Sequence, residues 1–445
     1  RAHNAGLKVK QDPAGNVCIC VPATAGKEKA PAVVLQAHID MVCEKNEETL
    51  FDFTRDSLRL VREGDWIRAD GTTLGADNGI GAAAALAAGF ASDLIHGPLE
   101  ILLTVDEETG LTGARGLSHD FISGRILLNL DSESSSSVCI GCAGGGGVTT
   151  DLKLDFKNIP DAARAFEIKL FGLQGGHSGL NIHENRGNAV KLMARLLQSL
   201  MDIGIDLADL HSGDKHNAIP REAKALISIA PDAVSKAAAI IELQLAAFKN
   251  EFSHEPHIDI SWAAARKPER VLCRASFATL LNMLFACPHG VLAMSRSMPG
   301  LVETSNNLAS VHLTDNMLRM HTTPRSSLAQ ALKTTASQIV AVGNLAGAES
   351  REEPSYPGWH PNTDSRLLHI FEKVYESLFG NKPKREATHA GLECGIIGDT
   401  YHGMDMISFG PDIRNCHSPV EAVNIRSVEK FWNVLTGLLA VLAKL

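Results

Sequence analysis

Apolar runs that do not alternate with polar residues are the feature of this sequence that most restricts its fold. Three stretches, "PAVVLQAHID", "PLEILLTVDEETG" and "GRILLNLDSE", carry such runs. Runs of this kind are typical of strands that are buried on both faces of a sheet. A loop followed by an Ala-rich helical stretch, "GTTLGADNGIGAAAALAAGFASDL", lies between the first two. The pattern therefore predicts an α/β domain, a parallel or mixed sheet flanked by helices.

The length of 445 residues favours more than one domain. After Asp131 the Ser/Gly-rich stretch "SESSSSVCIGCAGGGGVTT" indicates a domain boundary. The following strand-like and helix-like stretches, among them an amphipathic helix over Arg186–Met201, fit a smaller α+β domain. The last part of the chain resumes the first pattern. We therefore expect one domain formed by residues 1–144 and 357–445, and a second domain, 145–356, inserted into it.

Composition excludes several classes of partner. The formal net charge is -9 and the pI about 6.1, which argues against nucleic acid and anionic membranes as partners. No run is apolar over a length that would span a bilayer, and no secretory signal is visible. The nine cysteines form no disulfide framework and no zinc-site spacing, as expected for a cytoplasmic protein. The chain begins without Met at "RAHNAGLKVKQDPAGN", so we expect residues to precede it.

Acidic and histidine side chains follow the predicted strands at the points where the strands end. In an open α/β sheet, ligands gather at the carboxyl ends of the strands, so these side chains are expected to converge. The set comprises His38, Asp40, Asp77, Glu107, Glu108, Asp131 and His417.

Five carboxylates and two imidazoles in one place repel one another unless cations neutralise them. Zinc accepts this mixture of ligands, and there are too many of them for one tetrahedral ion. Two ions that share a bridging carboxylate fit better, and such a pair polarises a carbonyl and acidifies a water. If the strand continued through Glu107 and Glu108, their side chains would point in different directions. One could then bind metal while the other accepts the proton of the water.

Each of these residues alone has an ordinary explanation. An Asp at a strand end is often a helix cap or a turn former. A single His is usually a surface or satisfied core residue, and the Glu pair could be solvated. The inference to a dinuclear site rests on their joint occurrence at strand and helix edges of one domain.

At these residues the sequence resembles a known family. "HIDMV", "GTTLGADNGIGAA", "DEETGLTGA", "NLDSE", "GGHSG", "HAGLECG" and "SFGP…HSP" are similar, in that order, to motifs of the co-catalytic zinc peptidases related to aminoacylase, carboxypeptidase G and peptidase T. "HNAIPREA" and "YPGWHPNTDS" resemble the branch that cleaves dipeptides with a C-terminal histidine. The resemblance covers essentially the whole chain.

The resemblance implies a ligand set for two Zn²⁺ per subunit, with Co²⁺ or Mn²⁺ as possible substitutes. His38 and Asp131 would complete one zinc site, Glu108 and His417 the other, and Asp77 would bridge them. The inserted domain would be a lid and dimerisation domain, so the likeness implies a homodimer.

Further roles also come from the resemblance. Asp40 would orient the His38 imidazole, and Glu107 would be the general base that later protonates the departing amine. His177 would stabilise the oxyanion. Asn217 and Arg325 would hold substrate, with the fork of Arg325 suited to a terminal carboxylate.

Three residues stay without a role at this point. Cys416 precedes the metal-type histidine in "NCHSP" and is either a core thiol or a competitor for zinc. Glu393 and His389, in "HAGLECG", are candidates for substrate contact.

The resemblance implies a dipeptide substrate of the Xaa-His type, including β-alanyl-histidine. An N-acyl-amino-acid amidohydrolase, similar to an aminoacylase or a desuccinylase, is the alternative with the same chemistry. A non-catalytic metal-binding scaffold is a third possibility, although no ligand or base is missing from the motifs. A nucleotide site at "GCAGGGGV" lacks the required glycine spacing and acidic residue.

Overall fold

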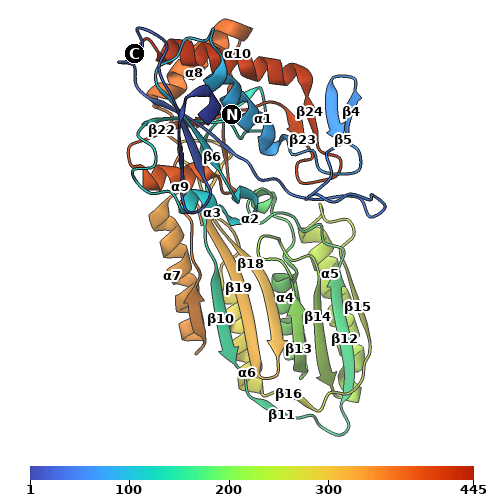
Figure 1. Ribbon diagram of the computed structural model, residues 1–445. Coiled ribbons are helices and arrows are strands. Elements are labelled where there is room, and N and C mark those ends of the chain that lie inside the picture. The colour runs from blue at the N-terminus through green and yellow to red at the C-terminus, as the bar shows by residue number, and fades with distance from the viewer. The chain divides into compact units, whose positions relative to one another are not determined.

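The computed structural model describes residues 1–445, which divide into two compact units. Unit 1 comprises Arg1–Cys142 and Gly358–Leu445, and unit 2 comprises Ala143–Pro357. Each unit has its own sheet and its own helices (Figure 1). None of the helices combines the length and the apolar character that crossing a bilayer requires.

The main sheet of unit 1 has eight strands and is mixed. β3 runs parallel to β6 and β7, β22 runs parallel to β7, and β1, β2 and β6 pair antiparallel. This confirms the predicted α/β class with a mixed sheet. In spatial order the strands are β1 (Lys8–Gln11), β2 (Val17–Val21), β6 (Leu99–Thr104), β3 (Val33–His38), β7 (Ile126–Asn129), β22 (Asp405–Ser408), β8 (Ser137–Cys142) and β21 (Lys384–Thr388).

Helices flank this sheet, and a small second sheet completes unit 1 (Figure 1). The helices are α1 (Ala76–Phe90), α2 (Glu107–Gly110), α3 (Thr112–Arg115), α8 (Arg366–Phe379), α9 (Glu393–Thr400), α10 (Ile425–Leu442) and the 3₁₀ turn η1 (His3–Ala5). The small sheet contains β23 (Ile413–Arg414), β24 (Ala422–Asn424), β5 (Trp66–Ala69) and β4 (Leu60–Glu63).

The register of the parallel strands brings three chain segments to one edge of the sheet. His38, the last residue of β3, pairs with Thr104, the last residue of β6. Gln36 of β3 pairs with Asn129, the last residue of β7. The segments that follow β3, β6 and β7 therefore leave the sheet side by side, as expected for a ligand site at the carboxyl ends of parallel strands.

Unit 2 is built on a ten-stranded sheet. Its main path is β15 (Asp259–Ala264), β12 (Arg164–Phe171), β14 (Ala223–Ile229), β13 (Asp206–Ser212), β18 (Val302–Thr314), β19 (Met317–Ser326), β10 (Val148–Lys153) and β20 (Glu349–Glu352). Two further strands extend it, β17 (Gly290–Met294) on β18 and β9 (Gly144–Gly145) on β19. A separate two-stranded ribbon consists of β11 (Phe156–Asn158) and β16 (Arg270–Leu272).

Helices cover one face of this sheet and enclose the core of the unit with it (Figure 1). They are α4 (Ala189–Met201), α5 (Val234–Glu251), α6 (Arg274–Ala286) and α7 (Ala329–Leu345), with short turns η2 (Ile182–Glu184) and η3 (Pro231–Ala233). α4 begins later than the predicted Arg186, because the Asn188 side chain caps it by accepting a hydrogen bond from the Lys191 N–H at 3.2 Å.

The Ser/Gly-rich stretch near the first unit boundary is more ordered than its composition suggests. Its residues form β8, which is buried along its whole length, and β9. A Cβ at Gly141 would lie 2.5 Å from the Pro361 side chain, so the close approach of the chain at this point requires glycine.

Candidate metal centre

His38 lies at the centre of a first group of ligand-type atoms in unit 1. It ends β3, and its side chain is 1% exposed. Its Nε2 lies 3.1 Å from Asp77 Oδ1 and 3.3 Å from Asp131 Oδ1. Asp131 follows β7, and Asp77 lies at the beginning of α1. The three ligand atoms lie within 4.8 Å of one another, so one ion can contact all three.

His417 lies at the centre of a second group, which shares Asp77 with the first. Its Nε2 lies 3.3 Å from Asp77 Oδ2 and 3.1 Å from Glu108 Oε2. Asp77 thus directs one carboxylate oxygen to each histidine, which is the arrangement of a bridging carboxylate. The other oxygen of Glu108, Oε1, is buried and has no hydrogen-bond partner. A buried carboxylate oxygen of this kind is costly unless a cation contacts it.

Glu107 and Glu108 differ from the prediction in their secondary structure. β6 ends at Thr104, and the two glutamates lie in the first turn of the short helix α2, not in a continuing strand. Asp40 fixes this turn, because its two carboxylate oxygens accept hydrogen bonds from the N–H groups of Glu107 and Glu108, each at 3.1 Å. Adjacent side chains of a helical turn also point in different directions.

Asp40 contacts His38 as well. Its Oδ1 lies 3.5 Å from His38 Nδ1, and its main-chain oxygen lies 3.0 Å from the same nitrogen. An acceptor at Nδ1 holds the proton on that nitrogen and leaves Nε2 free to bind a metal. β3 ends before Asp40, so a turn of the loop, not strand alternation, directs its side chain to His38.

The carboxylates of the centre outnumber its histidines, and this excess of negative charge changes the pKa values of the side chains. Burial and the nearby Asp131 raise the pKa of Glu107 to about 9. Burial opposes protonation of His38, yet its contacts with Asp131, Asp40 and Asp77 raise its pKa above the ordinary value. Divalent cations would replace those protons and neutralise the carboxylates, so the donor set fits a dinuclear metal cofactor.

Two residues that the sequence did not single out hold the ligands in place. Glu421 is 2% exposed, and its carboxylate accepts hydrogen bonds of 2.7–3.3 Å from four consecutive N–H groups, those of residues 74–77. Asn78 donates hydrogen bonds to the Leu130 carbonyl and to Asp131. No local pattern marks Glu421, because its partners lie more than 340 residues away in the sequence.

The structure also places the residues that the sequence left without a role. Glu393 is fully buried and accepts hydrogen bonds from Gln36 Nε2 at 2.6 Å and Thr104 Oγ1 at 2.7 Å. It therefore supports the strands below the centre and is closed to solvent; His389 is buried too. The Cys416 thiol lies within 4.8 Å of an oxygen of Asp77 and an oxygen of Glu133.

His177, Asn217 and Arg325 belong to unit 2. His177 Nδ1 accepts hydrogen bonds from the N–H groups of Gly179 and Leu180 at 3.1 and 3.0 Å. The proton of the neutral ring is therefore on Nε2, which is left as a donor. Burial and the positive charge of Arg325 lower the pKa of His177 to about 4.

Arg325 is a buried cation without an acidic partner. It is 8% exposed, donates to the Ser178 hydroxyl at 3.3 Å and to the Tyr356 hydroxyl at 2.9 Å, and forms no ion pair. A guanidinium in this state is suited to bind an anion. Asn217 contacts Ser178, the residue whose hydroxyl accepts from Arg325: the Asn217 carbonyl accepts a hydrogen bond from the Ser178 N–H at 2.8 Å. The residue is exposed.

Comparisons with known proteins identify the family. The sequence model of peptidase family M20/M25/M40 matches residues 34–441. The cytosol non-specific dipeptidase of Escherichia coli (strain K12) is 41% identical over 440 residues, which cover 98% of this chain and 91% of that protein. The aminoacylhistidine dipeptidase structure from Vibrio alginolyticus matches with a TM-score of 0.91 and 40% identity, covering 99% of this chain and 90% of that one.

A more distant match shows the fold alone. The aminopeptidase PepT structure from Bacillus cereus has a TM-score of 0.58 and 14% identity over 99% of this chain and 90% of that one. From the family model and the two similar dipeptidases it follows that this chain belongs to peptidase family M20/M25/M40 and is a metallopeptidase, a hydrolase of peptide bonds with a divalent metal cofactor.

Proposed function

We propose that this protein is a dinuclear-zinc dipeptidase that hydrolyses dipeptides with a C-terminal histidine, including β-alanyl-histidine. The observation that carries the proposal is the position of Asp77 between His38 and His417, with one oxygen directed to each. The names of the two similar proteins, a non-specific dipeptidase and an aminoacylhistidine dipeptidase, support a dipeptide as substrate.

In this proposal His38 and Asp131 would hold one zinc ion, Glu108 and His417 would hold the other, and Asp77 would be shared by both. The distances of 3.1–3.3 Å around the two imidazoles support this division of ligands. When bound, the two ions polarise the scissile carbonyl and lower the pKa of the attacking water. Co²⁺ and Mn²⁺ tolerate the same ligands.

Glu107 is the proposed general base. Its carboxylate removes a proton from the attacking water, whose oxygen forms the new bond to the carbonyl carbon. As the C–N bond breaks, Glu107 returns the proton to the departing amine nitrogen. Burial beside Asp131 makes Glu107 a strong proton acceptor, while bound cations favour its ionised form, so both states are accessible near neutral pH. Asp40 is a positioning residue that holds both His38 and the turn of Glu107.

Unit 2 supplies the proposed substrate contacts. The Nε2–H of neutral His177 donates to the oxyanion, a role that its fixed tautomer supports. Arg325, buried without an acidic partner, binds the terminal carboxylate of the dipeptide, and Asn217 contributes a further polar contact.

We also propose a homodimer formed through unit 2. β17 pairs with β18, and its Val291, Leu292 and Met294 are exposed, together with Phe285 of α6. Exposed apolar side chains of this kind are typical of interfaces. Light scattering after size-exclusion chromatography tests this, with Leu292→Arg as the disrupting variant.

We further propose a cytoplasmic location, which fits the nine free cysteines and the cytosolic relative.

Histidine release from β-alanyl-histidine tests the proposed function. The purified protein should cleave this dipeptide, lose activity on chelation and regain it with Zn²⁺. Alanyl-alanine measures how strictly the enzyme requires a C-terminal histidine, and N-acetyl-histidine tests amidohydrolase activity. Cleavage of N-acetyl-histidine with no cleavage of either dipeptide would overturn the proposal in favour of an amidohydrolase.

A further inference from the structure

We propose a second metal site in unit 2, formed by His211 and His312 and oriented by Asp209, that takes a borderline divalent ion such as Zn²⁺. The two histidines lie directly opposite each other on the antiparallel strands β13 and β18. Their Nδ1 atoms are 3.3 Å apart. Two ligands of one tetrahedral zinc ion, each bonded at about 2.0–2.1 Å, are separated by about 3.3–3.4 Å. The pair therefore has the spacing that a single ion requires.

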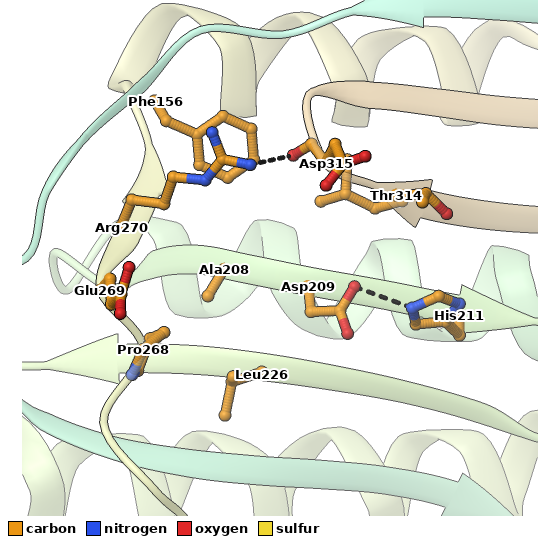
Figure 2. A pocket seen from close by; sticks show the side chains of 11 residues that line it. Phe156, Ala208, Asp209, His211, Leu226, Pro268, Glu269, Arg270, Thr314 and Asp315 are labelled. Atoms are coloured by element: carbon orange, nitrogen blue, oxygen red, sulfur yellow. Dashed lines mark hydrogen bonds and ion pairs between the residues drawn. The ribbon is translucent and has the colours of Figure 1, made fainter.

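Asp209 gives the first histidine the tautomer that a metal ligand needs. Its Oδ1 lies 2.9 Å from His211 Nε2, the contact drawn as a dashed line in Figure 2. This contact places the ring proton of neutral His211 on Nε2, so that the lone pair of Nδ1 faces His312. Histidine ligands of metals generally have a carboxylate or carbonyl at the other ring nitrogen.

Both histidines lie on the face of the sheet opposite to the helices. Their neighbours Leu210, Val311 and Leu313 point into the core of unit 2, so side-chain alternation places His211 and His312 outward. His211 borders two surface pockets of about 490 and 530 Å³, the first of which is shown in Figure 2, and His312 borders the second. Water can therefore occupy the remaining coordination positions.

Charged neighbours across the sheet set the expected strength of the site. Arg319 faces His312 from β19, but it forms a two-point ion pair with Asp151 at 2.7 and 3.1 Å. Lys224 faces His211 from β14 and forms no ion pair, so its charge opposes a cation at the site. Replacing Lys224 by Gln should therefore strengthen metal binding.

A second histidine pair in unit 2 lacks these features. His216 and His321 meet edge to face, and His321 Nδ1 lies 3.1 Å from Thr149 Oγ1 and 3.3 Å from Glu353 Oε1. Nδ1 of His321 therefore already has protein partners. Only the pair His211–His312 presents two facing Nδ1 atoms.

Equilibrium dialysis of the holoenzyme against rising free Zn²⁺, with metal counted by mass spectrometry, tests the site. Wild-type protein should bind one more ion per chain than His211→Gln or His312→Gln. The exposed His402 of unit 1 provides the matched control, since His402→Gln should keep the wild-type count. Asp209→Ala should weaken the additional ion by about 10-fold or more, and Lys224→Gln should strengthen it.

Anomalous diffraction from zinc-soaked crystals locates the ion. The expected result is a peak between the two Nδ1 atoms that is missing in His312→Gln. Equal zinc counts in the wild type and both histidine variants, or an anomalous map without that peak, would overturn the proposal. The contact between His211 and His312 would then be a hydrogen bond between two imidazoles. Circular dichroism verifies that each variant is folded, and the two substitutions lie on different strands.

Discussion

The carboxylate of Asp40 accepts a hydrogen bond from the main-chain N–H of Glu107 at 3.1 Å. The same oxygen lies 3.5 Å from His38 Nδ1, and the second oxygen accepts from the N–H of Glu108. One side chain thus links the end of β3 to the turn that follows β6. The orientation of a metal-type histidine and the position of the candidate base depend on the same carboxylate.

Asp40→Asn should disturb both the orientation of the His38 ring and the position of Glu107. An Asn side chain has one acceptor oxygen and a donor NH₂ group, so one of the N–H groups of α2 is left facing another donor. We expect metal affinity to fall by about 10–100-fold, with a comparable fall in kcat. Metal titration and steady-state kinetics measure the two effects. Asp106→Asn is the control, because Asp106 is exposed and contacts Thr112; equal behaviour of the two variants would contradict the assigned role.

The fold class and most of the centre could be predicted because their signals are local. Apolar runs without alternation identify buried parallel strands, and His38 and Asp131 lie where these runs end. The predicted secondary structure of Glu107 and Glu108 is wrong, because they lie in the helical turn α2 and not in a strand. The strand ends at Thr104, and a hydrogen-bonded turn held by Asp40 replaces its continuation.

Other parts of the site are determined by tertiary contacts and had no local signal. Glu421 is recognisable only when its carboxylate meets the N–H groups of residues 74–77. Glu393, expected as a possible substrate contact, is buried because the start of α9 packs against β3 and β6. Helix α6 is different, because its buried residues recur at helical spacing and the sequence therefore carries a local signal for it. They are Phe277, Leu280, Leu281, Met283 and Leu284.

His177 should stay neutral well below the pH at which an ordinary histidine is protonated. Burial and Arg325 lower its pKa to about 4 from the ordinary 6.5. Its contribution to stability is therefore complete above about 6.5 and is lost as the pH falls towards 4. NMR titration of ¹³C-labelled histidine measures this pKa, and Arg325→Met should raise it. Arg221→Met, at an exposed arginine, should leave it unchanged. A wild-type pKa near 6.5 would contradict the described environment.

Glu393→Gln should stabilise the metal-free protein at alkaline pH. Burial raises the pKa of Glu393 to about 7 from the ordinary 4.5. The folded protein therefore keeps a proton that the unfolded chain releases, and the resulting loss of stability begins above 4.5 and is complete above 7. Gln removes the charge and keeps an acceptor for Gln36 and Thr104. We expect a gain of roughly 1–3 kcal/mol at pH 8 and little at pH 4.5.

Urea unfolding at the two pH values measures this difference. Glu376→Gln, at an exposed position of α8, is the matched control and should change neither value. A destabilised Glu393→Gln protein at pH 8 would show that Glu393 is ionised and required in its buried position.

The central claim is that adjacent glutamates have different functions: Glu107 transfers the proton and Glu108 holds metal. The most direct measurement compares Glu107→Gln with Glu108→Gln for bound zinc per chain and for kcat on β-alanyl-histidine. We expect Glu107→Gln to keep both ions while kcat falls by at least about 100-fold, and Glu108→Gln to lose one ion. Loss of metal from Glu107→Gln, or a Glu107→Gln enzyme with nearly wild-type kcat, would contradict this claim.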